Sequence, residues 1–134
     1  MQFIKMTKNE LVNVSSIDEQ HKKFVDVINK LFDALQNNNK KEVITYLDML
    51  IEDLETHFEH EETLMKTYNY PGYISHKLEH DRIYNKIVSA SNKNKSGEEP
   101  LLLENLDLLK RWFFNHLDIN DKKLGAHLIQ KGIK

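Results

Sequence analysis

Residues 57–80 read HFEHEETLMKTYNYPGYISHKLEH and contain two pairs of side chains that can bind a metal. Side chains four positions apart on an α-helix project within roughly 40° of each other, so His57 and Glu61 share one face. His76 and His80 share a face in the same way. The Tyr-Pro-Gly sequence at 70–72, between the pairs, is typical of a turn. The segment therefore predicts two antiparallel helices that direct three imidazoles and one carboxylate inward.

The size and composition of the chain limit what this cluster can belong to. With 134 residues, we expect a single domain, 1–134, with one hydrophobic core. A formal net charge of −2 and the lack of a basic run argue against nucleic acid or an anionic membrane as a partner. The sequence contains no cysteine, which excludes disulfides and thiolate metal sites. It also shows no signal-peptide pattern and no apolar run near the roughly 20 residues of a membrane span, so we expect a cytoplasmic location.

Apolar residues at helical spacing predict four long helices and no strands. The first covers about 17–36, after a capping box formed by Ser16 and Glu19, and the second runs from about 41 to 65. The third starts near Pro71 and ends before a polar segment, 91–99, which is predicted to be a surface loop. The fourth runs from about 100 to 116. Short connections between four such helices predict an all-α, antiparallel up-down-up-down four-helix bundle.

Two further segments complete the predicted organisation. Residues 1–14 are poorly periodic and are expected to form an N-terminal arm that lies across the helices, while the bundle is assigned to residues 15–118. The helical pattern is interrupted at 118–120. Residues 119–134 are then predicted to contain a short C-terminal helix over 121–130.

The predicted topology brings further histidines to the level of the first two pairs. His21 lies near the start of the first helix, and His116 lies near the end of the fourth. In antiparallel helices these positions share one layer with the end of the second helix and the start of the third. Six potential ligands from all four helices would converge there, which chance placement of core histidines would rarely produce. We therefore predict a buried metal site.

Asp121 needs a separate argument, because a residue five positions after His116 projects about 140° away on a straight helix. The interruption at 118–120 suggests that a helix break returns the Asp121 carboxylate to the site. Five imidazoles and two carboxylates are too many donors for one ion. Two octahedral ions with bridging carboxylates and one oxo or hydroxo bridge would use these donors and leave one position open for an exogenous ligand.

The residues in this pattern resemble those of the hemerythrins, in particular the single-domain bacterial type. The resemblance covers nearly the whole chain. The matching segments are IDEQHKKF around His21, HFEHEETLM with His57 and Glu61, YPGYISHKLEH with His76 and His80, and WFFNHLDINDKKLG with His116 and Asp121. Seven ligand types in this order and spacing are a specific signal.

The resemblance implies two non-haem iron ions, cycling between Fe2+ and Fe3+, with an oxo or hydroxo bridge. Glu61 and Asp121 would bridge the ions. One iron would be held by His76, His80 and His116, and the other, which keeps the open position, by His21 and His57.

The function implied by the resemblance is reversible O2 binding for storage, delivery or scavenging, without enzymatic turnover. The imidazole-rich donor set carries less negative charge than the carboxylate-rich sites of ferritin-like enzymes, and the chain contains no Glu-x-x-His motif. Apolar side chains are predicted to form a dry wall around the bound O2: Phe24, Phe58, Trp112, Phe113 and Leu117.

Two other functions stay open at the level of sequence. One is a di-iron redox enzyme that acts on peroxide or nitric oxide or protects iron-sulfur enzymes, with a reductase or client protein as partner. The other is a sensor of O2, nitric oxide or peroxide. Outside the cluster, His60 and His127 match no ligand position and are predicted to be solvated surface residues and not to modulate the site. Glu62 is predicted to be solvated or to pair with a residue four positions away on its helix.

Overall fold

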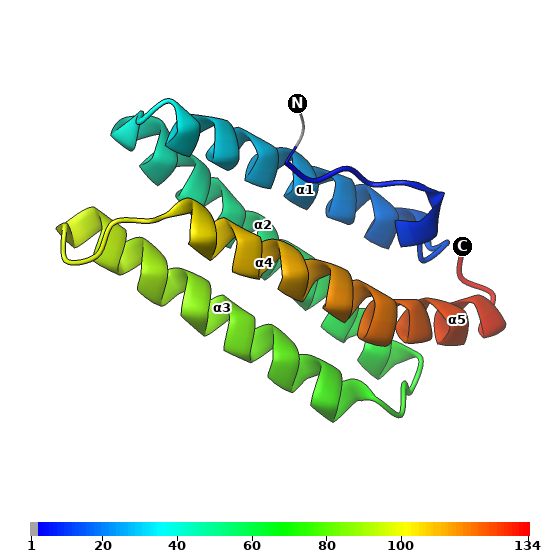
Figure 1. Cartoon of the computed structure of the whole chain (residues 1–134). Helices are drawn as coiled ribbons and strands as arrows, with labels where there is room; N and C mark the ends of the chain where they lie inside the picture. The colour runs from blue at the N-terminus through cyan, green and yellow to red at the C-terminus, as the bar shows by residue number, and fades with distance from the viewer. Residues whose placement is uncertain (1–2) are drawn as a thin grey trace.

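The structure is a computed structural model that describes residues 3–134, so the first two residues of the predicted arm lie outside it. Four long helices form an antiparallel bundle (Figure 1). They are α1 (Ser15–Gln36), α2 (Lys40–Thr67), α3 (Tyr73–Ser96) and α4 (Leu103–His116). A shorter helix, α5 (Lys122–Gln130), continues the line of α4. Residues 3–134 contain no strand, and the predicted all-α bundle is confirmed.

Apolar side chains form two buried clusters on either side of the predicted ligand layer. The larger cluster fills most of the bundle, and the smaller one gathers where the arm and α5 meet the helix ends. On α1, His21 lies between Ile17 of the small cluster and Phe24 of the large one. Burial of each such side chain contributes about 1.5–3 kcal/mol to stability. None of the helices in the described part of the chain is long and apolar enough to cross a membrane.

The N-terminal arm is anchored to two helices of the bundle. Ile4 is fully buried. Its backbone N–H donates to the side-chain oxygen of Asn29 on α1 at 2.7 Å, and its carbonyl accepts the side-chain NH2 of Asn29 at 3.0 Å. Lys110 on α4 donates to the carbonyl of Phe3 at 2.9 Å. A single 3-10 turn, Lys8–Glu10, interrupts the otherwise irregular arm. The arm therefore ties α1 to α4, as its predicted course across the helices requires.

The predicted capping box at the start of α1 is wrong. The N-cap residue is Val14, and the Ser16 side chain, which lies inside the first turn, caps no backbone group. The carboxylate of Asp18 instead accepts the backbone N–H groups of Val12 at 2.8 Å and Asn13 at 3.1 Å. This largely buried carboxylate fixes the end of the arm against the helix. Such local bonds from an aspartate side chain to the backbone are an alternative to capping by serine.

The predicted surface loop at 91–99 is also wrong over most of its length, because α3 continues to Ser96. Ser91 is buried and keeps the inner face of the helix continuous, while its polar neighbours lie on the solvated side. The helix ends at Gly97, whose φ of 80° is in the left-handed region that favours glycine. A polar composition alone did not distinguish a solvated last turn from a loop.

Gly125 on α5 lies directly against the arm. A Cβ added there would be 2.7 Å from the carbonyl oxygen of Val12 and 3.0 Å from its Cβ. We expect Gly125→Ala to lower the free energy of unfolding by about 1–3 kcal/mol despite the higher helix propensity of alanine, because the backbone must move. Urea denaturation measures the change, and Ala126→Ser on the exposed side of α5 is the control. A Gly125→Ala variant as stable as the parent would contradict this close packing.

Candidate metal centre

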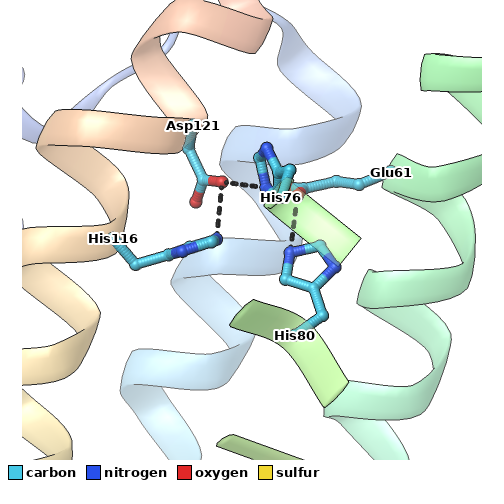
Figure 2. Close-up of side chains that lie close together, drawn as sticks. All are labelled: Glu61, His76, His80, His116 and Asp121. Atoms are coloured by element: carbon cyan, nitrogen blue, oxygen red, sulfur yellow. Dashed lines mark ion pairs between the residues drawn. The ribbon is translucent and has the colours of Figure 1, made fainter. Parts of the chain in front are cut away.

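All seven predicted ligand side chains meet in one buried layer of the bundle. None of the seven residues is more than 7% exposed. They fall into two groups that share both carboxylates: Glu61, His76, His80, His116 and Asp121 in one (Figure 2), and His21, His57, Glu61 and Asp121 in the other. Within each group the potential ligand atoms lie within 4.8 Å of one another. The antiparallel topology thus brings together residues that are far apart in the sequence.

Asp121 reaches the layer through a π-helical turn, Leu117–Asp121, between α4 and α5. The backbone N–H of Lys122 donates to the carbonyl of Leu117, a bond that spans five residues instead of four. A residue five positions after His116 therefore lies on the same side of the helix. His116 Nε2 is 3.1 Å from Asp121 Oδ1 (Figure 2). The predicted helix break at 118–120 is wrong, because the chain stays helical through this wider turn.

The carboxylate of Asp121 directs one oxygen to each group of histidines. Its Oδ1 lies 3.0 Å from His76 Nε2 and 3.1 Å from His116 Nε2. Its Oδ2 lies 3.1 Å from His21 Nε2. Asp121 can therefore serve both groups at once.

Glu61 is arranged in the same way from the opposite side of the layer. Its Oε1 lies 3.2 Å from His76 Nε2 and 3.3 Å from His80 Nε2. Its Oε2 lies 2.9 Å from His57 Nε2 and 3.8 Å from His21 Nε2. Each carboxylate thus has one oxygen close to two histidines of the first group, and its other oxygen lies close to His21 of the second group, in the case of Glu61 also to His57.

The short contacts between the imidazole nitrogens and the carboxylate oxygens lack the geometry of hydrogen bonds. Among the described residues, several buried ligand atoms have no hydrogen-bond partner: the Nε2 atoms of His21, His76, His80 and His116, both oxygens of Glu61, and Oδ1 of Asp121. Leaving such groups unpaired costs free energy. In an octahedral complex with bonds of about 2.1 Å, neighbouring ligand atoms are roughly 3.0 Å apart, which agrees with most of the spacings here. The donor set therefore fits metal ions better than it fits hydrogen bonding.

Three of the imidazoles are oriented by a side chain from the preceding helix. Their Nδ1 atoms lie at hydrogen-bonding distance from an oxygen acceptor: 2.7 Å for His57 and Gln20, 3.0 Å for His80 and Glu62, and 3.2 Å for His116 and Glu79. An acceptor at Nδ1 favours the tautomer that is protonated there and leaves the Nε2 lone pair free for a metal.

Sequence reasoning missed these orienting residues. Glu62 was predicted to be solvated or to pair within its own helix, and this is wrong, because its carboxylate contacts His80 on the next helix. Each of them is adjacent in sequence to a ligand position of its own helix: Gln20 to His21, Glu62 to Glu61, and Glu79 to His80. A polar residue beside an inward ligand points sideways, toward the neighbouring helix. That adjacency is the signal that could have identified them.

In the metal-free protein the two carboxylates remain ionised. Burial raises the pKa of Glu61, but the neighbouring imidazoles, His57 foremost, hold that pKa well below its usual range. Burial and the charge of Glu61 raise the pKa of Asp121, but His116 and His21 outweigh both and lower it. The negative charge that a cation would neutralise is therefore present at neutral pH.

The imidazoles compensate by binding protons. Burial lowers the pKa of His76, but the adjacent carboxylates Asp121 and Glu61 outweigh burial and raise that pKa to about 9. The pKa values of His21 and His116 are also raised, because the same carboxylates outweigh their burial. A metal ion that binds here must displace these protons.

An apolar cavity of about 10 Å³ borders the second group of histidines, which is room for about one water-sized molecule. Its lining residues are Phe24, Phe58, Trp112 and Phe113 of the predicted wall, together with Leu54, His21, His57, His116 and Asp121. Leu117, also predicted for the wall, is fully buried in the larger cluster but does not line the cavity.

Two aromatic side chains of the wall also stack on potential ligands. The ring centroids of Phe58 and His80 are 3.9 Å apart, and those of Trp112 and His116 are 4.7 Å apart. The wall and the ligands therefore position each other.

The two remaining histidines lie outside the cluster. His60 Nε2 is 2.9 Å from the hydroxyl of Ser16, and His127 Nε2 is 2.7 Å from the backbone carbonyl of Tyr68. Both side chains are partly buried and paired, so their predicted surface position is correct only in part.

The fold is an α-helical bundle, and its buried layer of five histidines and two carboxylates could hold metal ions. Fold and site together define the class as metal-binding helical bundles. Comparison with known proteins specifies the class further. Residues 12–128 match the hemerythrin HHE cation-binding domain. The chain belongs to the hemerythrin family.

Individual relatives agree over most of the chain. A bacteriohemerythrin of Methylococcus capsulatus is 34% identical over 116 residues, which cover 87% of this chain and 88% of the relative. A bacteriohemerythrin of Pseudomonas aeruginosa is 32% identical over 108 residues, covering 81% and 70%. The crystal structure of a wild-type hemerythrin superposes with a TM-score of 0.90 at 32% identity and covers 94% of this chain and 98% of that one.

The contact between Glu62 and His80 predicts a specific loss of metal affinity. Glu62→Ala should weaken Fe2+ binding roughly 10- to 100-fold, because the His80 ring loses the acceptor that orients it. Anaerobic competition with a coloured chelator measures the affinity. Glu59→Ala, an exposed glutamate on the same helix, is the matched control and should bind as the parent does. Equal affinities for both variants would show that the Glu62 contact has no orienting role.

The metal-free and metal-loaded proteins should respond to pH in opposite directions. The His76 pKa of about 9 exceeds its ordinary value of 6.5, so protonation stabilises the metal-free fold fully below about pH 6.5 and this stability is lost as pH rises through 9. Metal binding needs neutral imidazoles and strengthens over the same range. Thermal unfolding across pH 6.5 to 9 measures both slopes, and His76→Gln should flatten the metal-free one. Slopes of the same sign would contradict the assigned protonation.

Proposed function

We propose that the protein binds O2 reversibly at a non-haem di-iron centre and thereby stores, delivers or scavenges O2. The observation that carries this proposal is the unequal division of the histidines around two shared carboxylates. Three imidazoles lie in one group and two in the other, and the apolar cavity borders both imidazoles of the smaller group. An ion in the smaller group would have fewer protein ligands, and its remaining position would face an apolar space.

The residues would divide between two irons as follows. His76, His80 and His116 would hold one iron, and His21 and His57 the other. Glu61 and Asp121 would bridge them, which their oxygen-to-nitrogen distances support. A solvent-derived oxo or hydroxo group would complete the pair. Two ferrous ions held by these residues would supply the reversible electron transfer that O2 binding needs.

The side chains around the cavity favour binding over turnover. Apart from the four potential ligands, all the residues that line the cavity are apolar: Phe24, Leu54, Phe58, Trp112 and Phe113. No further acid is available in that lining to protonate bound O2, a step that would commit it to cleavage or release as peroxide. The apolar wall also excludes water from the ligand, which limits proton leakage. For these reasons we propose a carrier and not an enzyme.

The orienting contacts serve the same purpose. Gln20, Glu62 and Glu79 hold the Nδ1 protons of His57, His80 and His116. These contacts fix the tautomer that leaves each Nε2 free for a metal, and the two carboxylate acceptors make their imidazoles stronger donors. The imidazoles are neutral in this tautomer, so among the seven ligands only Glu61 and Asp121 bring negative charge, less than in a carboxylate-rich set.

Anaerobic reduction followed by titration with O2 tests the proposal. The purified protein should contain two irons per chain, and an absorption band should appear on addition of O2 and disappear under argon. The reversal follows from a cavity that offers no proton donor beyond the ligands. Irreversible conversion, sustained peroxide turnover, or a stoichiometry of one iron per chain would overturn it. Asp121→Ala, which removes one proposed bridge, should reduce the iron content.

A further inference from the structure

A second and larger apolar space lies beside the site cavity. This cleft, of about 280 Å³, runs between α3 and α4. The backbones of these two helices approach each other at few points, in contrast to α1 with α2 and α2 with α3. Its wall is formed mainly by side chains of the larger cluster: Leu50, Ile83, Ile87, Leu106, Leu109 and Trp112. Lys86 and Asn105 are the polar residues that line it.

Trp112 is the side chain that joins the two spaces. It alone among their lining residues borders both the cleft and the site cavity. Trp112 is also only partly buried, whereas the other described residues that line the cavity are buried. Its ring lies flat on His116 and edge-on to Phe58, with centroids 4.7 and 6.4 Å away. The indole of Trp112 therefore lies between the cleft and the cavity.

We propose that the cleft is a binding site for small nonpolar gas molecules and the route by which O2 reaches the site cavity, with Trp112 as the movable side chain between them. This inference rests on the proposed function, since O2 is the molecule to be conveyed. It goes further by assigning a place where O2 resides before it reaches the irons.

The lining of the cleft favours a nonpolar gas. Pockets for drug-sized ligands contain several placed polar groups that fix the orientation of the ligand. Among the described residues, only Lys86 and Asn105 bring polar side chains to this cleft. A diatomic gas needs no hydrogen-bond partner and gains free energy by leaving water for apolar surroundings. Apolar cavities bind xenon and similar molecules, and the aliphatic side chains that line this cleft are of the same kind.

A route affects the rates of binding and not the equilibrium, because the free energies of the two end states are unchanged. Narrowing the cleft should therefore slow O2 entry and O2 escape by one common factor. A change in the cavity itself would instead alter the affinity. This difference separates a role in access from a role in holding the ligand.

The test uses Ala90→Phe, which adds a ring to the lining of the cleft from α3. In iron-loaded protein, stopped-flow measurements should show association and dissociation rate constants both reduced roughly tenfold, equivalent to a barrier raised by about 1.4 kcal/mol, with unchanged affinity. Ala126→Phe, an exposed alanine on α5, is the matched control and should leave both rates unaltered. Leu108→Trp, which enlarges a more exposed side chain that lines the cleft but not the cavity, should likewise lower both rates, and this second variant decides the matter if Ala90→Phe does not fold.

Xenon supplies a readout that does not depend on O2 binding. Crystals of the iron-loaded protein under xenon pressure should show xenon in the cleft, and Ala90→Phe should remove it. Absence of xenon from the parent cleft, or unaltered rates in Ala90→Phe and Leu108→Trp, would overturn the inference alone. Xenon in the cleft of a protein that binds no O2 would instead overturn the proposed function and, with it, the role of the cleft as an O2 route.

Discussion

The structure depends on one constraint, which is that five imidazoles and two carboxylates are enclosed in a layer between two apolar clusters. Removing such groups from water costs several kcal/mol for each charge unless partners replace the lost hydration. Protons on the imidazoles provide a partial solution in the metal-free protein, as the raised pKa of His76 shows. The orphaned atoms and their spacing indicate that metal ions are the complete solution. The apolar clusters on either side must supply the stability that this layer does not.

The orienting contacts follow the order of the helices around the bundle. Gln20 on α1 contacts a histidine of α2, Glu62 on α2 one of α3, and Glu79 on α3 one of α4. Helices α1, α2 and α3 each therefore present a ligand inward and, from the adjacent residue, an acceptor to the next helix. The series has no member from α4 to α1, since the Nδ1 atom of His21 has no partner among the described residues. Ring orientation is thus shared between neighbouring helices, and the packing of the bundle and the geometry of the site are set together.

Sequence patterns were sufficient for the bundle and for the convergence of the ligands, because both follow from helical periodicity and antiparallel topology. The same reasoning did not predict the backbone geometry that brings Asp121 to the site. Periodicity assumes a constant rise and turn, whereas the π turn at 117–121 changes the number of residues per turn at one point. The capping box failed because the helix begins at Ser15, before the predicted cap, while Asp18 bonds the end of the arm, and the Ser16–Glu19 pattern reveals neither feature. Leu54 was missed from the cavity wall because it reads as an ordinary core leucine.

The unequal division of the histidines also accounts for where the apolar wall is placed. In the proposed centre, the ion bound by three imidazoles and two carboxylate oxygens is surrounded by protein, and a bridging oxygen would complete six positions. The ion bound by His21 and His57 has one donor fewer. A vacancy there would fill with water unless the neighbouring space were small and apolar, and the cavity beside these two histidines has both properties. The placement of Phe24, Phe58 and Phe113 therefore belongs to the chemistry of the site as much as to the packing of the core, because these side chains decide which molecule can take the open position.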